Sequence, residues 1–410
     1  MISCHQGPQY ANPNGSSKSS YLIVMEKIIE EMDSNQRQWG SGYISGMLSI
    51  FLAGIGLATV LCLMYPQFLT VSQARAHYNV PLIRLAVQFD LVLAFVLGCI
   101  SLTLRSSKIL GFLSTTMVLG ATLLGGSQAA KQLETASDIY FGLDFFVLNL
   151  IFLAVIFVPL ERLFKKNDQY IFREEWREDL FYFFVGTILV QILTFLSLAP
   201  AFAILKATPW AGEFRQAVAS QPNWLQFIEI MFLTDLFQYW FHRAFHEVPW
   251  LWRFHAIHHS AKRMDWLAGS RMHFMETVLL RAFTTIPMYA MGFAESPLYL
   301  YIFFVFLMSK FVHSNIRFHF GWLQYVIATP RFHHWHHGVE KEAINVNYAV
   351  HFPIIDRIFG TYHLPLNRWP SGYGVSDDSV PNGFIKQLLY PFSRKESKPD
   401  GGATVESRDC

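Results

Sequence analysis

Six long apolar runs constrain this chain more than any other feature of its sequence. They lie near 43–65, 83–104, 109–127, 143–160, 180–204 and 224–241. Each run approaches the roughly 20 apolar residues that a helix needs to cross the hydrocarbon core of a bilayer. Charged residues make up only 15% of the chain, against about 25% in soluble domains. The sequence therefore predicts an all-α, polytopic membrane protein.

A seventh apolar stretch, 277–312, is interrupted between Gly292 and Pro297. Each half is shorter than the roughly 20 residues of a straight span. The stretch therefore predicts either a hairpin that dips into the bilayer or two short, tilted spans.

Basic residues between the runs predict how the chain is oriented. Arg105 and Lys108 follow the second run, and the loop after the fourth run, which carries Arg162, Lys165 and Arg173, is the most basic of all. Because Lys and Arg collect in cytoplasmic loops, these loops, the N-terminus and everything after the sixth run are predicted to be cytoplasmic. We expect an integral multi-pass protein of the inner membrane in a bacterium, or of the endoplasmic reticulum in a eukaryote.

Histidines are concentrated in the second half of the chain, where 14 of the 16 lie between His242 and His363. Residues at i, i+3 and i+4 share one face of a helix, so spaced histidines can aim their rings at one point. Three clusters have this spacing: His242 and His246; His255, His258 and His259; and His333, His336 and His337. Together they offer more imidazoles than one ion can bind, so the sequence predicts two metal ions.

The ligand type limits which metals can bind but does not select a single one. Imidazole suits zinc, copper, iron and nickel alike. A structural zinc site usually includes cysteine, and no cysteine lies near the clusters. Neutral nitrogens that leave room for oxygen favour iron and redox chemistry. The alternative is a histidine-rich membrane metal transporter or metal-binding protein, although a transporter would place its ligands inside the spans.

At these residues the sequence resembles the fatty acid hydroxylase and sterol desaturase superfamily. The family pattern is HxxxH, HxxHH and HxxHH after membrane spans, and the words DLFQYWFHRAFH, LWRFHAIHHS and TPRFHHWHHG match it. The resemblance covers roughly residues 140–365. It is strongest to the sterol desaturase-like branch that includes the alkylglycerol monooxygenase type, because the first motif has three residues between its histidines where fatty acid 2-hydroxylases usually have four.

The resemblance implies a non-haem diiron centre that uses O2 to hydroxylate or desaturate a C–H bond of a lipid. It implies that the eight motif histidines are iron ligands. His313 matches a further family histidine, and His273, in RMHFME, resembles a family word that also keeps Glu276. We expect His313 and His273 to join the ligands. The lipid could be a sterol, a fatty acyl chain or an ether lipid.

Other partners follow from what the sequence lacks. No GxGxxG after a strand, CxxCH or ferredoxin cysteine pattern occurs, so electrons must come from a separate cytochrome, ferredoxin or reduced pterin. No basic stripe suggests nucleic acid as a partner.

Three residues outside the clusters are candidates for supporting the chemistry. Asp235 lies two helical turns before His242 and Asp356 follows the third cluster, so either carboxylate could accept a proton from a ligand's other nitrogen. Asn347 could orient the third cluster. Helix capping, or a salt bridge with a nearby arginine, is an equally simple role for them.

The sequence thus predicts a helical membrane protein with a histidine-rich helical catalytic cap on its cytoplasmic side. Its predicted parts are a disordered polar N-terminus at 1–40, spans without an assigned role at 41–140, a catalytic domain at 141–365 and a polar tail at 366–410.

Overall fold

A computed structural model describes residues 20–32, 40–130, 140–207, 212–375 and 380–393. Helices make up all the regular structure of these ranges, apart from two isolated β-bridges, Lys165 with Ile316 and Gly338 with Tyr373. The all-α prediction is therefore confirmed. The chain divides into two compact units: residues 1–67 with 72–136, and residues 68–71 with 137–410.

The first unit is built on three long helices, α2 (Tyr43–Met64), α5 (Val80–Leu104) and α6 (Ile109–Leu123). Helix α2 packs against both of the others. Small residues allow this approach: a Cβ at Gly46 would lie 2.5 Å from Ser101 Oγ, and one at Gly111 would lie 2.7 Å from the Gly98 carbonyl oxygen. Such close packing is typical of helices within a membrane, where burial of apolar surface cannot drive association. The short elements are α1 (Ser20–Met32), α4 (Ser72–Arg75) and η1 (Gly126–Gln128), while α3 (Pro66–Leu69) is divided between the two units.

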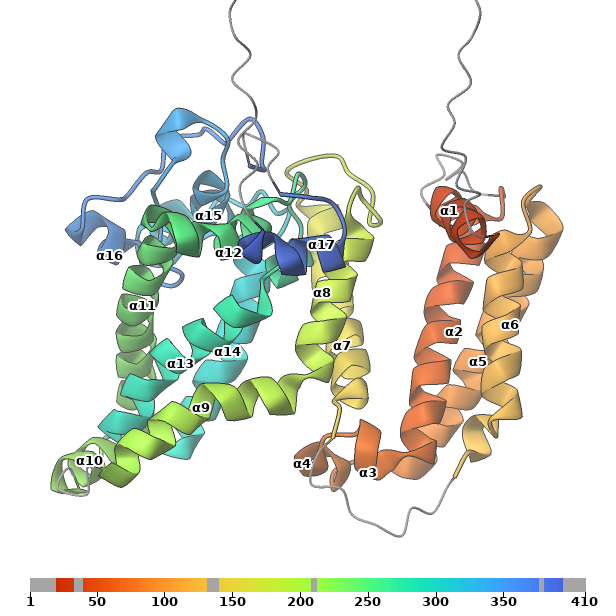
Figure 1. Cartoon of the computed structure of the whole chain (residues 1–410), viewed down its shortest axis with the longest axis horizontal. Helices are drawn as coiled ribbons and strands as arrows, with labels where there is room; N and C mark the ends of the chain where they lie inside the picture. The colour runs from red at the N-terminus through yellow and green to blue at the C-terminus, as the bar shows by residue number, and fades with distance from the viewer. Residues whose placement is uncertain (1–19, 33–39, 131–139, 208–211, 376–379, 394–410) are drawn as a thin grey trace, which may run out of the picture. The chain divides into compact units, whose positions relative to one another are not determined.

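The second unit combines long helices with a group of short ones. The long helices are α7 (Leu143–Leu163), α8 (Trp176–Ile188), α9 (Val190–Ala207), α11 (Asn223–Glu247), α13 (Phe274–Met291) and α14 (Glu295–His313). The short ones are α10 (Gly212–Ala219), α12 (Pro249–His259), η3 (Ala268–Ser270), η4 (Gly321–Tyr325), α15 (Pro330–His336), η5 (Lys341–Ala343), α16 (Pro353–Ile358), α17 (Phe384–Leu389) and η6 (Tyr390–Phe392). Helix α11 packs against α12, α13 and α14, and α9 lies along α13. Helices α12, α15, α16 and α17 gather at one end of α11, and α10 lies at its other end (Figure 1).

Five helices of the described ranges are long and apolar enough to cross a membrane: α2, α5, α6 with η1, α7 and α14. The fifth predicted run forms α8 and α9, which meet at a 65° bend and could together make one more span. The sixth run forms α11, which is continuous but is not among the five. Its polar residues Gln226, Glu229 and Asp235 lower its hydropathy. The predicted break in the seventh stretch lies between Met291 and Glu295, where Gly292 caps α13 with φ 80°.

Candidate metal centre

Two groups of histidines, all buried except the half-buried His246, lie where the short helices meet α11 and α14. The first group is His242, His246, His255, His259 and His336, and the second is His258, His313, His333 and His337. Within each group, one ring nitrogen from every member lies within 4.8 Å of those of all the others. Helices α11, α12, α14 and α15 supply all of them except His337, which directly follows α15. The structure thus brings together nine of the ten histidines that the sequence nominated as ligands.

The nitrogens that converge are Nε2 atoms. In the first group, Nε2 of His255 lies 3.0 Å from that of His242 and 3.2 Å from that of His259. In the second group, Nε2 of His313 lies 3.1 Å from that of His258 and 3.0 Å from that of His333. Two nitrogens bound at about 2.0–2.1 Å to one ion, at about right angles, would lie about 3.0 Å apart.

The opposite nitrogen of five of these rings contacts an oxygen. In four rings this oxygen is a backbone carbonyl: Nδ1 lies 2.8 Å from the Tyr348 carbonyl in His242, 2.8 Å from that of Arg271 in His258, 2.7 Å from that of Ser309 in His313 and 2.8 Å from that of Val346 in His336. In the fifth ring, His255, Nδ1 lies 2.5 Å from Glu276 Oε1. A carbonyl can only accept, so Nδ1 of the four rings must donate, which leaves a lone pair on each Nε2 of the neutral ring.

Facing lone pairs cannot hydrogen-bond to one another. Nε2 of His258 and that of His313 are both acceptors, yet they lie 3.1 Å apart. Nε2 of His246 is also buried without a hydrogen-bond partner. A cation between these nitrogens would satisfy them, so the residues present fit a metal ion in each group.

Burial keeps the imidazoles in the form that binds metal. Removal from water lowers the pKa of His258 to about 4. Burial and the neighbouring rings also hold the pKa of His259, His336 and His337 below the usual range. The rings are therefore neutral near pH 7, and neutral imidazole is the species that ligates a metal.

Asp235 and Asp356 contact backbone instead of a histidine. Asp235 accepts hydrogen bonds from the backbone N–H groups of Val350 and Phe352, each at 2.7 Å. Asp356 accepts from the N–H groups of Tyr348 at 2.8 Å and Ala349 at 2.9 Å. The two carboxylates therefore hold segment 346–352, whose carbonyls at Val346 and Tyr348 orient His336 and His242.

Asn347 holds the same segment from its other side. Its Nδ2 donates to the carbonyls of Phe332 at 2.9 Å and His363 at 2.6 Å, and its Oδ1 accepts from the His363 N–H at 2.7 Å. Its backbone is left-handed, with φ 56°, a conformation that asparagine tolerates better than most residues. It lies next to the third cluster but touches no ligand nitrogen in the described contacts.

His273 lies outside both groups. It is the N-cap residue of α13, and its Nδ1 accepts from the Met275 N–H at 3.2 Å while its Nε2 donates to the Leu388 carbonyl at 3.1 Å. With both nitrogens engaged elsewhere, this ring does not face the other nine, which differs from the sequence expectation. Glu276, one turn further along, points to the centre instead and accepts from His255.

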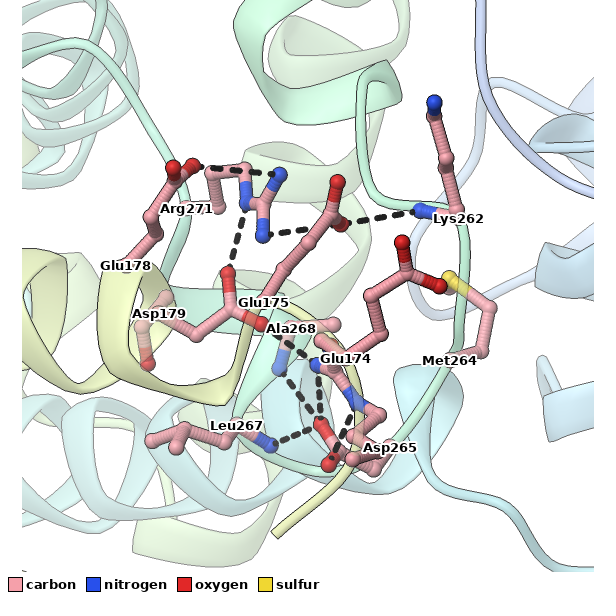
Figure 2. A network of polar contacts seen from close by, with 12 residues as sticks. Glu174, Glu175, Glu178, Asp179, Lys262, Met264, Asp265, Leu267, Ala268 and Arg271 are labelled. Atoms are coloured by element: carbon pink, nitrogen blue, oxygen red, sulfur yellow. Dashed lines mark hydrogen bonds and ion pairs between the residues drawn. The ribbon is translucent and has the colours of Figure 1, made fainter. Parts of the chain in front are cut away.

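A buried ion-pair network contacts the second group through Arg271 (Figure 2). Arg271, whose carbonyl orients His258, donates from Nε to Asp179 at 2.6 Å and lies 3.2 Å from Glu175. Arg173 donates to both oxygens of Asp265 at 2.7 Å and also to Asp179. Burial lowers the pKa of Arg173, but the two carboxylates outweigh it and hold that pKa above its usual range. Sequence reasoning used Arg173 only for orientation and did not consider Arg271. The acidic residues that follow Arg173, in REEWRED, were the signal for pairing.

A mostly apolar cavity opens onto both groups. It is lined by Gln238, Phe241, Met272, Glu276, Leu280, Ser309, Val312 and Val350, by Gly269, and by His242, His255, His258, His313 and His333. Its apolar residues come mainly from α11, α13 and α14. An apolar molecule in this cavity would therefore lie directly against imidazoles of both groups.

The family model for fatty acid hydroxylases matches residues 227–361, which contain all nine converging histidines. This part of the chain is therefore similar to the fatty acid hydroxylase family. The predicted resemblance to the fatty acid hydroxylase and sterol desaturase superfamily is confirmed.

The curated relatives that match this region are named for reactions on lipids. Ornithine lipid hydroxylase OlsE of Rhizobium tropici is 35% identical over 178 residues, which are 43% of this chain and 53% of the relative. Alkylglycerol monooxygenase of Xenopus tropicalis is 32% identical over 141 residues, 34% of this chain and 30% of the relative. The human alkylglycerol monooxygenase is 31% identical over 132 residues, 32% and 28% of the two chains. The chain therefore spans about half the length of these relatives or less. No solved structure matches the chain significantly.

Proposed function

We propose that the protein is a membrane-bound, iron-dependent enzyme that uses O2 to hydroxylate a lipid. The observation that carries this proposal is the cavity, which joins apolar helix faces to the imidazoles of two metal-binding groups. The relatives support hydroxylation over desaturation, because those compared here are named hydroxylases or monooxygenases. The overall reaction would consume one O2, two electrons and two protons for each lipid and release an alcohol and water.

The nine converging histidines would hold two iron ions, one in each group. Bound iron would supply the activation of O2 that a C–H bond requires. The protein's own contribution is to fix the ligands. Glu276 and the carbonyls of residues 271, 309, 346 and 348 hold five rings with Nε2 toward the centre. The apolar walls would exclude water from the reacting carbon.

The substrate would be a membrane lipid that enters from the bilayer between α11, α13 and α14. Exposed apolar side chains on these helices, including Phe232, Phe283 and Phe303, suit contact with acyl chains. Ornithine lipids and alkylglycerols, which the relatives' names specify, both combine a long alkyl chain with a polar group. They are therefore the first substrates to test.

The remaining parts of the proposal concern partners and orientation. A separate cytochrome, ferredoxin or reduced pterin would deliver the electrons. The basic loops support a cytoplasmic site. Residues 141–365 would form the catalytic domain, and the helices of the first unit would be accessory to it.

The decisive experiment combines metal analysis with isotope-labelled turnover. The purified protein is expected to hold about two iron ions per chain. With a reductant and ¹⁸O2, it should convert 1-O-hexadecylglycerol or an ornithine lipid into a product that carries one ¹⁸O atom. His258→Ala should abolish this product while the protein still inserts into membranes. Active protein without iron, or iron protein that transports metal and never oxidises lipid, would refute the proposal.

A further inference from the structure

One side chain of the cavity stands out because it is polar and has no assigned task. Gln238 lies among Phe241, Leu280, Val312 and Val350, all of which line the same cavity. It lies four residues before His242, so the two side chains share a face of α11 and are separated along the helix by about 6 Å.

Each of the other polar side chains of the cavity has at least one partner. Ser309 donates its hydroxyl to the Phe306 carbonyl at 2.9 Å, and its own carbonyl accepts from His313. Glu276 contacts His255 through Oε1, while its Oε2 is buried without a hydrogen-bond partner. The histidines are held by their Nδ1 atoms or converge on the metal-binding groups. Gln238, in contrast, makes no side-chain hydrogen bond or ion pair with any residue in the described ranges.

The half-buried amide of Gln238 is therefore free to serve a molecule in the cavity. A primary amide offers two donor hydrogens and an acceptor oxygen, and the apolar residues around it offer no partner. An occupant that brings its own oxygen to this position could accept a hydrogen bond from the amide, whereas a plain alkyl chain could not.

We infer that Gln238 is a specificity-determining residue of the cavity. Its amide donates a hydrogen bond to an oxygen of the lipid that lies a few bonds from the carbon to be oxidised. The ligand class is therefore a lipid with an ether, ester, amide or hydroxyl oxygen near the reactive carbon. This inference rests on the proposed function, since it concerns the substrate of the same centre.

The hydrogen bond would also set which carbon reacts. An alkyl chain in an apolar channel can slide by whole methylene groups at little cost. An oxygen fixed one turn from His242 removes that freedom and holds one carbon against the metal-binding groups. A site that hydrogen-bonds a substrate oxygen also rejects analogues that lack it.

The test compares two ligands on four proteins. Binding of radiolabelled 1-O-hexadecylglycerol and of octadecane, which lacks oxygen, is measured for the wild-type protein and for Gln238→Met, Gln238→Leu and Gln216→Leu in the same lipid nanodiscs. Methionine matches the length of glutamine without its amide. Gln216 is exposed on α10, outside the cavity, and controls for the loss of a glutamine.

Both Gln238 variants should bind the ether lipid about fivefold to tenfold more weakly than the wild type, with unchanged binding of octadecane. The position of oxidation in the ether lipid should spread to neighbouring carbons. Iron content should equal that of the wild type, which would show that His242 is undisturbed. Gln216→Leu should behave as the wild type for both ligands.

Equal binding of both ligands by the wild type, or equal losses for both ligands in the variants, would overturn the inference. So would a single unchanged position of oxidation in Gln238→Met. If the wild type oxidises no lipid but the difference in binding persists, the proposed function fails and the contact with Gln238 stands.

Discussion

Each orienting contact of the metal centre fixes one imidazole at the nitrogen that does not face the centre. Of the five oxygens that do this, four are backbone carbonyls and only Glu276 is a side chain. Its carboxylate is buried, and it both fixes the tautomer of His255 and strengthens that ring as a donor. A backbone carbonyl cannot be removed by mutation. Of the five orienting groups, Glu276 is therefore the one whose contribution to metal binding can be tested by substitution.

Replacing Glu276 with alanine should weaken iron binding by about tenfold to a hundredfold, because His255 loses the group that fixes its Nδ1 proton. The measurement is the iron retained after titration with a chelator. Glu213→Ala, at an exposed position on α10, serves as the control and should retain iron as the wild type does. Equal retention by the Glu276 variant would show that His255 needs no such partner.

At the scale of elements, two irregular segments supply backbone carbonyls that orient three of the histidine ligands. Segment 346–352 is held by Asp235, Asn347 and Asp356 and orients two ligands of the first group. The loop before α13 is held by the ion pairs of Arg271 and Asp179 and orients His258 in the second group. The two groups thus depend on separate supports.

Asp235→Ala should therefore affect the two groups unequally. Segment 346–352 would lose its anchor on α11, and the carbonyls that face His242 and His336 would shift. We expect iron content to fall from about two ions per chain toward about one. Metal analysis and Mössbauer spectroscopy would measure this. Glu229→Ala, an acidic residue elsewhere on α11, should keep both ions, and loss of both ions from the Asp235 variant would contradict separate supports.

Asp179→Asn should destabilise the fold. The carboxylate of Asp179 is fully buried and is shared by Arg173 and Arg271, which would both lose a charged partner while their guanidinium groups stay buried. Removing one partner of a buried ion pair costs about 3–5 kcal/mol. Denaturant unfolding in detergent would measure the loss. Asp168→Asn removes an exposed pair with Lys165 and should leave unfolding unchanged; a similar effect for both variants would contradict the prediction.

At the scale of the whole molecule, the second unit has its histidine groups at one end of α11 and α10 at the other (Figure 1). Helix α11 has 25 residues and is about 37 Å long, enough to separate the two sides of a bilayer. The orientation predicted from basic loops can therefore be tested at exposed positions near its two ends.

Single cysteines at Lys341 and Glu213, which are both exposed, should label differently in intact cells. Lys341→Cys, on the side of the histidine groups, should react with a membrane-impermeant maleimide only after permeabilisation. Glu213→Cys should react without it. The reverse pattern would place the histidine groups on the outer side and refute the cytoplasmic assignment.

The extent to which sequence anticipated the structure depends on whether a feature is local. Spacing alone placed His255, His258 and His259 on one face, because helix geometry fixes it. It could not show that these three divide between two groups, since that depends on where α14 and α15 pack. We expected His273 to be a ligand, but it caps α13, which begins at Phe274, and its Nδ1 accepts from the Met275 N–H. Glu276 contacts the ligand His255 instead. The sequence could not identify Gln238 as a candidate for substrate binding, because that role depends on the cavity that it lines.

The order of residues along the chain has a consequence for biosynthesis. Each histidine group combines residues that precede α13 and α14 with residues that follow them: His242 with His336, and His258 with His337. Neither group can close until both intervening helices have folded into place and α15 has left the ribosome. Metal loading must therefore follow the packing of α13 and α14, and a nascent chain stalled before α15 would carry histidines without a finished site.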